Sequence, residues 1–278
     1  MFSNLPKLAQ IAKETGETVL AMQKEIVANR NGEQETKRDG SVVTSADKKA
    51  NQIICNKLAD FFPGIPIVSE ENSRESNDAA LQADERFEID PLDNTSGYVQ
   101  GLDGFSVNIG RIRGGVPVAG AVYWPARKEL YFTGDDGKAY LQKGNTPPQK
   151  ISAKKLPLRT PLQAAVGFSE RHLSHLKNFK YEIQKHPAQL RTCMVACGKC
   201  DITGINKGKG VGFDSWDTVG PHAILLAAGG DIVDTEGSPM RYNNSTEKLP
   251  DHIAGANNVL VALGLAIKSQ ENQGRSLP

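Results

Sequence analysis

The chain has 278 residues, enough to bury a full core as one large domain or as two closely packed lobes. Hydrophobic residues make up 38% and charged residues 23%, as in an ordinary soluble protein, and a net charge of +1 excludes a global attraction to nucleic acid or membranes. No apolar run approaches the roughly 20 residues that span a bilayer, and no signal peptide is evident at the N-terminus, so we expect a cytoplasmic protein.

The N-terminal segment is predicted to contain two helices and a short strand. Apolar residues recur at helical spacing over residues 5–28, which predicts an amphipathic helix. Residues 29–40 are polar and end in Asp-Gly, which indicates a loop or a hairpin. Thr44 or Ser45 caps a second helix that ends before a Pro-Gly pair, and residues 65–69 then form a strand.

Acidic residues follow two short apolar strands. Glu70 and Glu71 come after the first strand, and Asp90 and Asp93 come after a second strand over residues 86–89. Two like charges about 4 Å apart repel by roughly 4 kcal/mol at an effective dielectric constant near 20, so this clustering is costly without a cation. Because Mg²⁺ prefers hard oxygen ligands, the pattern indicates a magnesium site at the ends of these strands. The acid-containing stretch between them, residues 71–85, is predicted to be a loop with a helical turn.

The second strand leads into the sequence Asp-Pro-Leu-Asp-Asn-Thr-Ser-Gly. Proline fixes φ and withholds a donor, so the chain is expected to leave the strand there and turn. Asp90 and Asp93 can then converge on one cation, with the carbonyl of Leu92 as a neutral ligand. A helix that opens at Asn94 and Thr95 would offer free N–H groups to an anion. Taken alone, these residues also fit an Asp helix cap with a second acid in the first turn.

The other acids also have structural interpretations when each is taken alone. Glu70 and Glu71 fit a solvated loop, and Asp47 fits a first-turn acid behind a Thr44 cap. The set is completed by Asp217, in the first turn of a predicted apolar helix. The set as a whole favours the metal site.

The middle of the chain alternates in the manner of an antiparallel meander. Its predicted strands cover residues 105–112, 116–123, 130–133 and 138–142, and a Pro- and Lys-rich lobe boundary follows at residues 145–161. The second half is predicted to contain both strands and helices. Strands are predicted at residues 164–168 and 231–235, and helices at residues 170–179, 188–200, 216–228 and 255–268.

The four cysteines are interpreted as reduced thiols. Cys193, Cys197 and Cys200 are spaced to share one face of the helix over residues 188–200. A zinc or iron–sulfur site would need a fourth ligand from Cys55 or a histidine, and the chain has no second C-x-x-C pair. Small buried thiols on an apolar helix face are therefore favoured.

The order and spacing of these motifs resemble the inositol monophosphatase superfamily, the Mg²⁺-dependent sugar and nucleotide phosphatases. The likeness covers roughly residues 5–268, with matching pieces at residues 39–47, 68–71, 90–95, 216–217 and 227–234. It implies an α/β (α+β) fold, a layered α-β-α-β-α sandwich of the inositol monophosphatase/fructose-1,6-bisphosphatase type. The active site would lie between an N-terminal lobe, residues 1–150, with most metal ligands and a C-terminal lobe, residues 151–278, with the substrate pocket. Such proteins are monomers or homodimers.

The resemblance also implies roles for individual residues. Two to three Mg²⁺ ions would be held by Glu70, Asp90, the Leu92 carbonyl, Asp93 and Asp217, with Glu71 as a candidate accessory residue. Asp47 and Thr95 resemble the pair that orients and deprotonates the attacking water. The backbone N–H groups of Asn94 and Thr95 would bind the phosphate, and metal-activated water would attack phosphorus in line.

Within the superfamily, the chain is most similar to the bacterial 3′(2′),5′-bisphosphate nucleotidases, which remove the 3′-phosphate of adenosine 3′,5′-bisphosphate. The likeness rests on the Asp-Pro-Leu-Asp turn and on residues 104–109 and 118–125. Arg191 stands where these enzymes have lysine and is expected to bind the substrate. Lys207 and Lys209 lie in a loop that would bind a second phosphate or form a flexible surface turn.

Two departures keep other functions open. Asn94 replaces the usual glycine, and Pro187-Ala188 replaces the usual Gly-Ser before the substrate helix. One alternative keeps the chemistry but acts on an inositol or sugar phosphate, although residues 201–216 lack the acid that inositol phosphatases use for ring hydroxyls. The other is a non-catalytic protein that binds metal and phosphate. A nucleic-acid-binding module is not favoured, because the chain has no basic stripe interleaved with aromatics.

Overall fold

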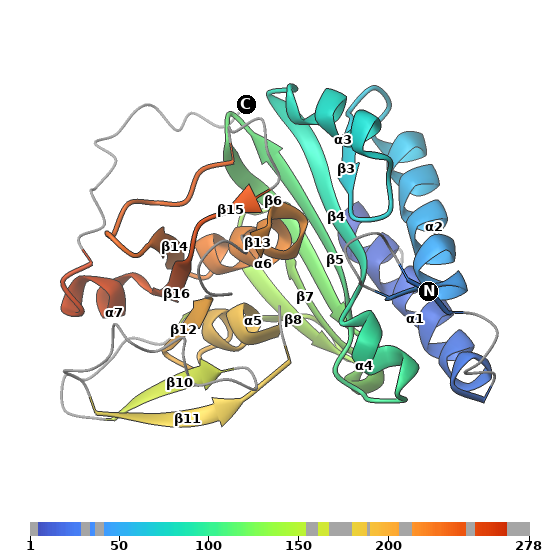
Figure 1. The fold of residues 1–278 in the computed structure, drawn as a ribbon. Coiled ribbons are helices and arrows are strands. Elements are labelled where there is room, and N and C mark those ends of the chain that lie inside the picture. Colours follow the sequence, from blue (N-terminus) through green and yellow to red (C-terminus); the bar gives the residue numbers. More distant parts are fainter. Residues whose placement is uncertain are drawn as a thin grey trace.

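Helices and sheets alternate in five layers in the computed structural model (Figure 1). The model describes residues 5–28, 34–36, 42–153, 161–166, 180–187, 190–205, 213–242 and 248–265. Helices α1 (Lys7–Ala28) and α2 (Ser45–Phe61) form the first layer, a seven-stranded sheet the second, and α5 (Leu190–Ala196) with α6 (Ser215–Ala227) the third. A five-stranded sheet and the short helix α7 (Asn257–Ala262) complete the stack, which confirms the predicted layered α/β architecture.

The first two helices form as their sequences predict. Helix α1 turns Leu8, Ile11, Val19 and Ile26 into a core shared with α2 and the first sheet. Thr44 caps α2, because its hydroxyl accepts the N–H of Ala46 at 3.1 Å while the Asp47 carboxylate accepts the Thr44 N–H at 2.7 Å. The polar segment before α2 is a hairpin of β1 (Gln34–Thr36) and β2 (Val42–Thr44).

The seven-stranded sheet has the order β3-β4-β5-β6-β7-β8-β9. Its strands are β3 (Ile67–Ser69), β4 (Glu85–Asp93), β5 (Ser106–Arg113), β6 (Val116–Trp124), β7 (Glu129–Thr133), β8 (Ala139–Lys143) and β9 (Gln149–Lys150). β3 and β4 are parallel and the remaining neighbours are antiparallel, which confirms the predicted meander. A 3-10 turn, Pro125–Arg127, joins β6 to β7.

The five-stranded sheet is mixed and has the order β11-β10-β12-β16-β14. Its strands are β10 (Leu162–Val166), β11 (Tyr181–Lys185), β12 (Ile202–Ile205), β14 (Gly230–Asp234) and β16 (His252–Ala256). The pair β13 (Phe213–Asp214) and β15 (Lys248–Leu249) lies beside the start of α6. The apolar core between the two sheets contains much of α5 and α6.

Helix α6 lies unusually close to the first sheet because three glycines meet there. A Cβ on Gly120 would lie 2.3 Å from the carbonyl oxygen of Gly220, and a Cβ on Gly110 would lie 2.6 Å from the Gly220 nitrogen. A Cβ on Gly220 itself would lie 2.9 Å from the carbonyl oxygen of Ile109. Real Cβ atoms do not approach backbone so closely, so the contact requires glycine on both sides.

A chain of buried polar contacts connects β4 with the C-terminal half. Arg86 pairs with Glu88 at 2.8 Å and also donates to the carbonyl of Tyr242 at 2.6 Å. The Tyr242 hydroxyl lies 2.9 Å from Nδ1 of His222 on α6, and Nε2 of His222 lies 2.8 Å from Asp231 on β14. These contacts hold α6 in register between the two sheets.

Several predicted boundaries are wrong. Residues 71–85 contain a two-turn helix, α3 (Arg74–Leu81), which Ser73 caps, so this segment is more than a loop. Residues 255–256 complete β16 and do not open the last helix. Strands β11 and β12 were not predicted. The predicted helix at 170–179 lies outside the described residues, and the lobe boundary near residue 150 stays a prediction.

The cysteine-bearing helix is also shorter than predicted. Helix α5 ends at Ala196, so Cys197 and Cys200 follow it and do not share a helix face with Cys193. Cys193 and Cys200 are buried in the core between the sheets, and Cys197 packs against it. None of the helices in the described residues is long and apolar enough to cross a membrane.

Candidate active site

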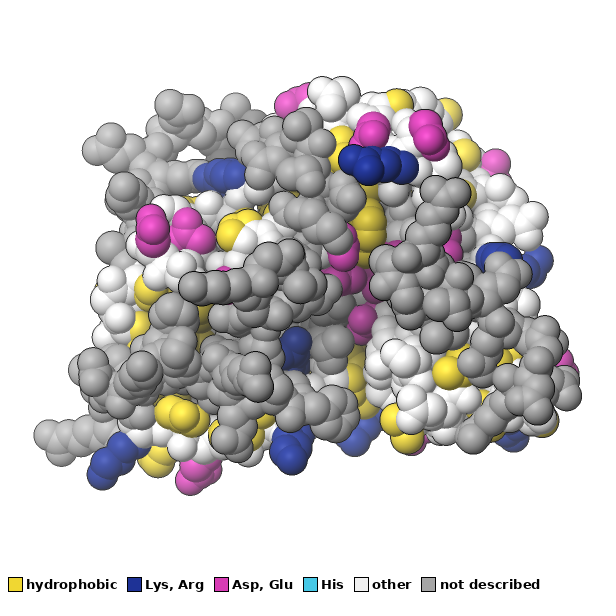
Figure 2. All heavy atoms as spheres, viewed as in Figure 1, with side chains coloured by type: hydrophobic (Ala, Val, Ile, Leu, Met, Phe, Trp, Pro, Cys, Tyr) yellow, Lys and Arg dark blue, Asp and Glu magenta, His cyan; other side chains and the backbone are white. Residues whose placement is uncertain are grey.

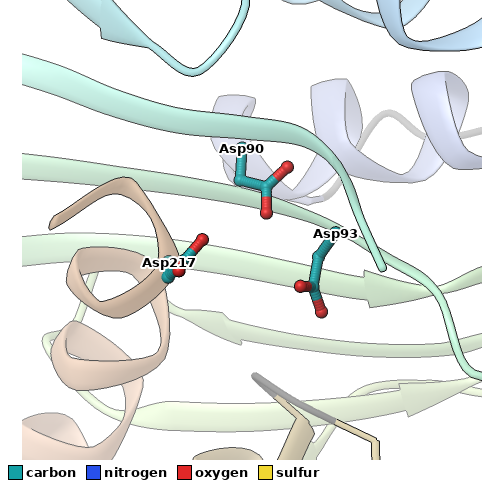
Figure 3. Close-up of side chains that lie close together, drawn as sticks. All are labelled: Asp90, Asp93 and Asp217. Carbon is teal, nitrogen blue, oxygen red and sulfur yellow. The ribbon is translucent and has the colours of Figure 1, made fainter. Parts of the chain in front are cut away.

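Three carboxylates meet where the end of β4 faces the first turn of α6 (Figure 3). Asp90 and Asp93 come from β4 and Asp217 comes from α6. One oxygen atom of each lies within 4.8 Å of the others. In the space-filling view, acidic side chains gather near the centre of the face, at the boundary between the two halves of the molecule (Figure 2). The predicted cluster of these three acids is present in the fold.

A bulge in β4 places Asp90 and Asp93 on the same side of the sheet. In a regular strand, residues three apart point to opposite faces. Here Asp90 pairs with Asn108 and Asp93 pairs with Ser106, so the register shifts by one residue between them. The chain therefore stays in the strand through Asp93, and the predicted departure at Pro91 is wrong. Proline is tolerated because a bulge leaves residues without ladder hydrogen bonds.

Packing on either side of Asp217 along α6 fixes the third carboxylate. Trp216 packs against the small apolar cluster that Val68 forms with α3 residues. The glycine contact at Gly220 holds the next turn of α6 against β5 and β6. Asp217 lies between these two anchors, so its position relative to β4 is set by the fold.

Burial and like charges both disfavour the ionised form of Asp90 in the cluster. Burial, the largest cause, raises the pKa of Asp90 well above its ordinary value, and the carboxylates of Glu70, Asp93 and Asp217 raise it further. A hydrogen bond from the Leu92 N–H, 3.1 Å from Oδ1 of Asp90, opposes the shift. Hard oxygen ligands that carry mutually repelling charges in a buried position fit a divalent cation such as Mg²⁺.

Asp47 and Thr95 form a hydrogen-bonded pair beside this cluster. The Thr95 hydroxyl lies 2.8 Å from Oδ1 of Asp47 and 3.0 Å from the carbonyl oxygen of Leu92. The other Asp47 oxygen accepts from the backbone and side chain of Thr44, at 2.7 and 2.6 Å. Burial raises the pKa of Asp47, the hydrogen bonds from Thr44 and Thr95 lower it, and the charge of Glu70 raises it. The fold thus brings together two residues that are 48 positions apart.

Asn94 opens α4 (Thr95–Val99) in the left-handed conformation, with φ 64° and ψ 47°. Its Oδ1 accepts from the N–H of Gly97 at 3.3 Å, and its Nδ2 donates to the carbonyl of Gly104 at 2.8 Å. The side chain is therefore engaged with residues 97–104. This explains how the turn survives without a glycine.

The remaining predicted residues are placed as follows. Glu70 directly follows β3, where its N–H lies 3.3 Å from the carbonyl of Ile89, and its charge acts on both Asp47 and Asp90. Glu71 is half-buried in the same turn, and its N–H donates to Ser69. Arg191 lies on α5, buried, with its guanidinium close enough to Asp93 for the carboxylate to oppose the lowering of its pKa by burial. Lys207 and Lys209 lie outside the described residues.

Sequence reasoning missed two residues at the site. Ser106 and Asn108 lie on β5, opposite Asp93 and Asp90. The Ser106 hydroxyl lies 3.4 Å from Oδ2 of Asp93 and 3.3 Å from Oδ1 of Asn108. The available signal was the alternation of β5, which puts these two polar residues on one face.

Fold and site together define an α/β protein with a carboxylate centre for divalent cations. The model of the inositol monophosphatase family matches residues 4–272, so the chain belongs to that family and is a metal-dependent phosphomonoesterase. Inositol monophosphatase 1 of Solanum lycopersicum is 32% identical over 226 residues, 75% of this chain and 80% of that protein.

Bacterial nucleotidases show comparable similarity. The 3′(2′),5′-bisphosphate nucleotidase CysQ of Salmonella typhimurium is 28% identical over 248 residues, 86% of this chain and 93% of that protein. The crystal structure of CysQ from Bacteroides thetaiotaomicron aligns with a TM-score of 0.73 at 26% identity and covers 91% of this chain and 97% of that one. The fold of the present chain is therefore that of the inositol monophosphatase family.

Proposed function

We propose that this protein is a Mg²⁺-dependent 3′(2′),5′-bisphosphate nucleotidase that hydrolyses the 3′-phosphate of adenosine 3′,5′-bisphosphate to give AMP. The observation that supports this substrate is Arg191, a buried guanidinium beside Asp93 at the carboxylate centre. A guanidinium binds phosphate through two parallel hydrogen bonds, which gives such a contact both direction and strength. The similarity to the CysQ nucleotidases over 86% of the chain points the same way.

The metal ligands in this proposal are Glu70, Asp90, the Leu92 carbonyl, Asp93 and Asp217. Bound there, Mg²⁺ would supply a nucleophilic hydroxide from water at neutral pH and would stabilise charge on the phosphoryl group. Removing one carboxylate should therefore abolish the reaction without unfolding the protein. Asp93→Asn is the variant of choice, and full phosphate release by it would contradict the assignment.

Asp47 and Thr95 act on the attacking water. Its proton passes to the Thr95–Asp47 pair as the water oxygen bonds to phosphorus and the bond to the 3′-oxygen breaks, and the released 3′-oxygen takes a proton from solvent water. The 2.8 Å hydrogen bond between the two side chains gives the hydroxyl a fixed direction. We expect Asp47→Asn to lower kcat by about 10²–10⁴-fold while Mg²⁺ binding, measured by calorimetry, changes little. A loss of Mg²⁺ binding in that variant would instead make Asp47 a ligand.

A second candidate function is hydrolysis of an inositol or sugar phosphate, favoured by the 32% identity to the tomato inositol monophosphatase. The deciding experiment compares phosphate release from adenosine 3′,5′-bisphosphate, inositol 1-phosphate and fructose 1,6-bisphosphate, each with Mg²⁺ and with EDTA. Mg²⁺-dependent turnover of the nucleotide alone supports the proposal. A preference for a sugar phosphate keeps the mechanism and rejects the substrate, and nucleotide binding without turnover favours a non-catalytic protein.

Arg191→Lys and Arg191→Ala separate substrate choice from chemistry. Inositol 1-phosphate lacks the second phosphate of the nucleotide. If Arg191 binds that second phosphate, the Ala variant should raise KM for the nucleotide far more than KM for inositol 1-phosphate. Lysine should restore part of the loss, since it keeps the charge but not the planar fork. Equal effects on both substrates would show that Arg191 only supports the fold of α5.

A further inference from the structure

Two polar side chains on β5 face the carboxylates of β4 from the neighbouring strand. Ser106 stands opposite Asp93 and Asn108 stands opposite Asp90, on the face that α6 covers. Both are fully buried, each with 0% of its surface exposed. The next residue on that face, Gly110, is the one that admits α6. The β5 row therefore lies under the site and makes no contact with bulk solvent.

The hydrogen bonds of this row are incomplete. Ser106 has one hydroxyl proton and lies within reach of two acceptors, Oδ2 of Asp93 at 3.4 Å and Oδ1 of Asn108 at 3.3 Å. Nδ2 of Asn108 is buried and has no hydrogen-bond partner among the described residues. An unsatisfied buried donor costs about 1–3 kcal/mol. An amide retained at this cost is expected to have an acceptor in the working state of the protein.

The pairing register identifies that acceptor. Residues directly opposite in an antiparallel pair have their Cβ atoms about 4.5–5.5 Å apart on the same face. This brings the amide of Asn108 within reach of the Asp90 carboxylate after a rotation of the side chains. The charges of three other carboxylates, Glu70, Asp93 and Asp217, act on Asp90. Oδ1 of Asp90 already accepts from the Leu92 N–H, so a donor on Oδ2 would fix the orientation of the carboxylate toward a cation.

We propose that Asn108 is a positioning residue of the metal centre, whose Nδ2 donates to the carboxylate of Asp90 when that carboxylate binds Mg²⁺. Ser106 does the same for Asp93. The pair forms an outer layer that fixes the orientation of two ligands, a role that commonly changes metal affinity by about 10–100-fold. The inference rests on the proposed function, because it requires Asp90 and Asp93 to be metal ligands.

The test is Mg²⁺ binding to the full chain by isothermal titration calorimetry, without substrate. Asn108→Ala should weaken Mg²⁺ binding about 10–100-fold, and Asn108→Ser, which keeps a donor, should recover part of the loss. Gln142→Ala is the matched control. Gln142 is also a buried amide with one unpartnered atom, Oε1, but it lies on β8 and bonds the Thr146 carbonyl. The Gln142→Ala variant should have a lower free energy of unfolding and unchanged Mg²⁺ binding.

Two outcomes overturn the proposal. The first is Mg²⁺ affinity of Asn108→Ala equal to that of the unmodified protein. The second is tighter Mg²⁺ binding by Asn108→Asp, which would make position 108 a ligand in its own right. If the unmodified protein itself fails to bind Mg²⁺, the proposed function fails first and the positioning role with it. Should Asn108→Ala not fold, Asn108→Ser and Asn108→Asp still carry the test.

Discussion

At the scale of single residues, Asn94 shows how a side chain can replace a glycine at a turn of left-handed conformation. Asparagine tolerates this conformation better than other non-glycine residues. Its two side-chain hydrogen bonds, to Gly97 and Gly104, then add stability that glycine cannot supply. The substitution therefore changes how the turn is held without changing its backbone.

This account predicts an order of stability for variants at position 94. Asn94→Gly keeps the conformation and loses two hydrogen bonds, so its free energy of unfolding should fall by about 1–2 kcal/mol. Asn94→Ala loses the same bonds and also pays about 1 kcal/mol or more for the left-handed backbone. Urea unfolding in EDTA measures the order. Equal stability of the Ala and Gly variants would show that the backbone conformation is not strained.

Much of the candidate site follows from the sequence because its candidate ligands belong to contiguous motifs. Asp90, Asp93 and Asp217 are where the motif order predicts, and Asp47 meets Thr95. Asn108 was not predicted as a site residue, because its place opposite Asp90 depends on how β5 pairs with β4. Asp90 lies 18 positions away in the sequence. Periodicity identifies the face of a strand but not its neighbour.

At the scale of elements, the contact between α6 and the first sheet is what sets the distance between Asp217 and Asp90. Gly120→Ala would place a methyl group against the Gly220 carbonyl, where 2.3 Å is available. Because the two nearest atoms belong to the Gly220 backbone, α6 must move to admit the methyl group. We expect a loss of stability of about 1–3 kcal/mol together with weaker Mg²⁺ binding, measured by denaturant unfolding and calorimetry.

A control separates stability from geometry in that experiment. Gly255→Ala on β16 is also tight, 3.0 Å from a side-chain carbon of Leu260, but it lies away from the carboxylate cluster. It should lower stability and leave Mg²⁺ affinity unchanged. If both variants weaken Mg²⁺ binding equally, the loss follows from general destabilisation.

Two of the elements that were predicted wrongly, β4 and β16, share a physical cause. Strand β4 continues through Pro91 because a bulge removes the need for a ladder hydrogen bond there, and a bulge has no reliable sequence signature. Strand β16 reads His-Ile-Ala-Gly-Ala, small residues with weak strand preference, and is specified by its two neighbours β12 and β14. Tertiary pairing decided both, whereas α1, α2 and the meander carry local patterns strong enough to predict.

At the scale of the whole molecule, a buried histidine makes stability depend on pH. Burial, the largest cause, lowers the pKa of His252 on β16 from the ordinary 6.5 to about 4, against a hydrogen bond to the Pro250 carbonyl at 2.8 Å. Below pH 6.5 the unfolded chain binds a proton that the folded chain does not, so stability falls as the pH drops toward 4. At about 1.4 kcal/mol per pKa unit, His252 contributes a loss of about 3 kcal/mol.

The comparison of the unmodified protein with His252→Gln isolates this effect. Both proteins share every other titrating group, so the difference between their free energies of unfolding reports on position 252. Urea unfolding at pH 7.5, 5.5 and 4.5 should show that difference shifting against the unmodified protein as the pH falls. A difference that does not change with pH would mean that His252 is solvated in solution.

The proposed metal centre would link distant parts of the molecule. Asp217 belongs to α6, whereas Asp90 and Asp93 belong to β4, so a Mg²⁺ ion bound by all three would join the two elements. Binding at 100 times the dissociation constant stabilises a protein by about 2.7 kcal/mol. The thermal midpoint should therefore rise by several degrees with Mg²⁺.

Asp217→Asn should change the thermal midpoint in opposite directions without and with Mg²⁺, which ordinary destabilisation cannot do. Without metal, this variant removes one of the charges that raise the pKa of Asp90, so its thermal midpoint in EDTA should be higher than that of the unmodified protein. With saturating Mg²⁺ the order should invert, because the variant has lost a ligand. Glu236→Gln, which alters an exposed acid after β14, should follow the unmodified protein in both conditions. Melting curves that keep the same order with and without Mg²⁺ would show that Asp217 is not part of the metal centre.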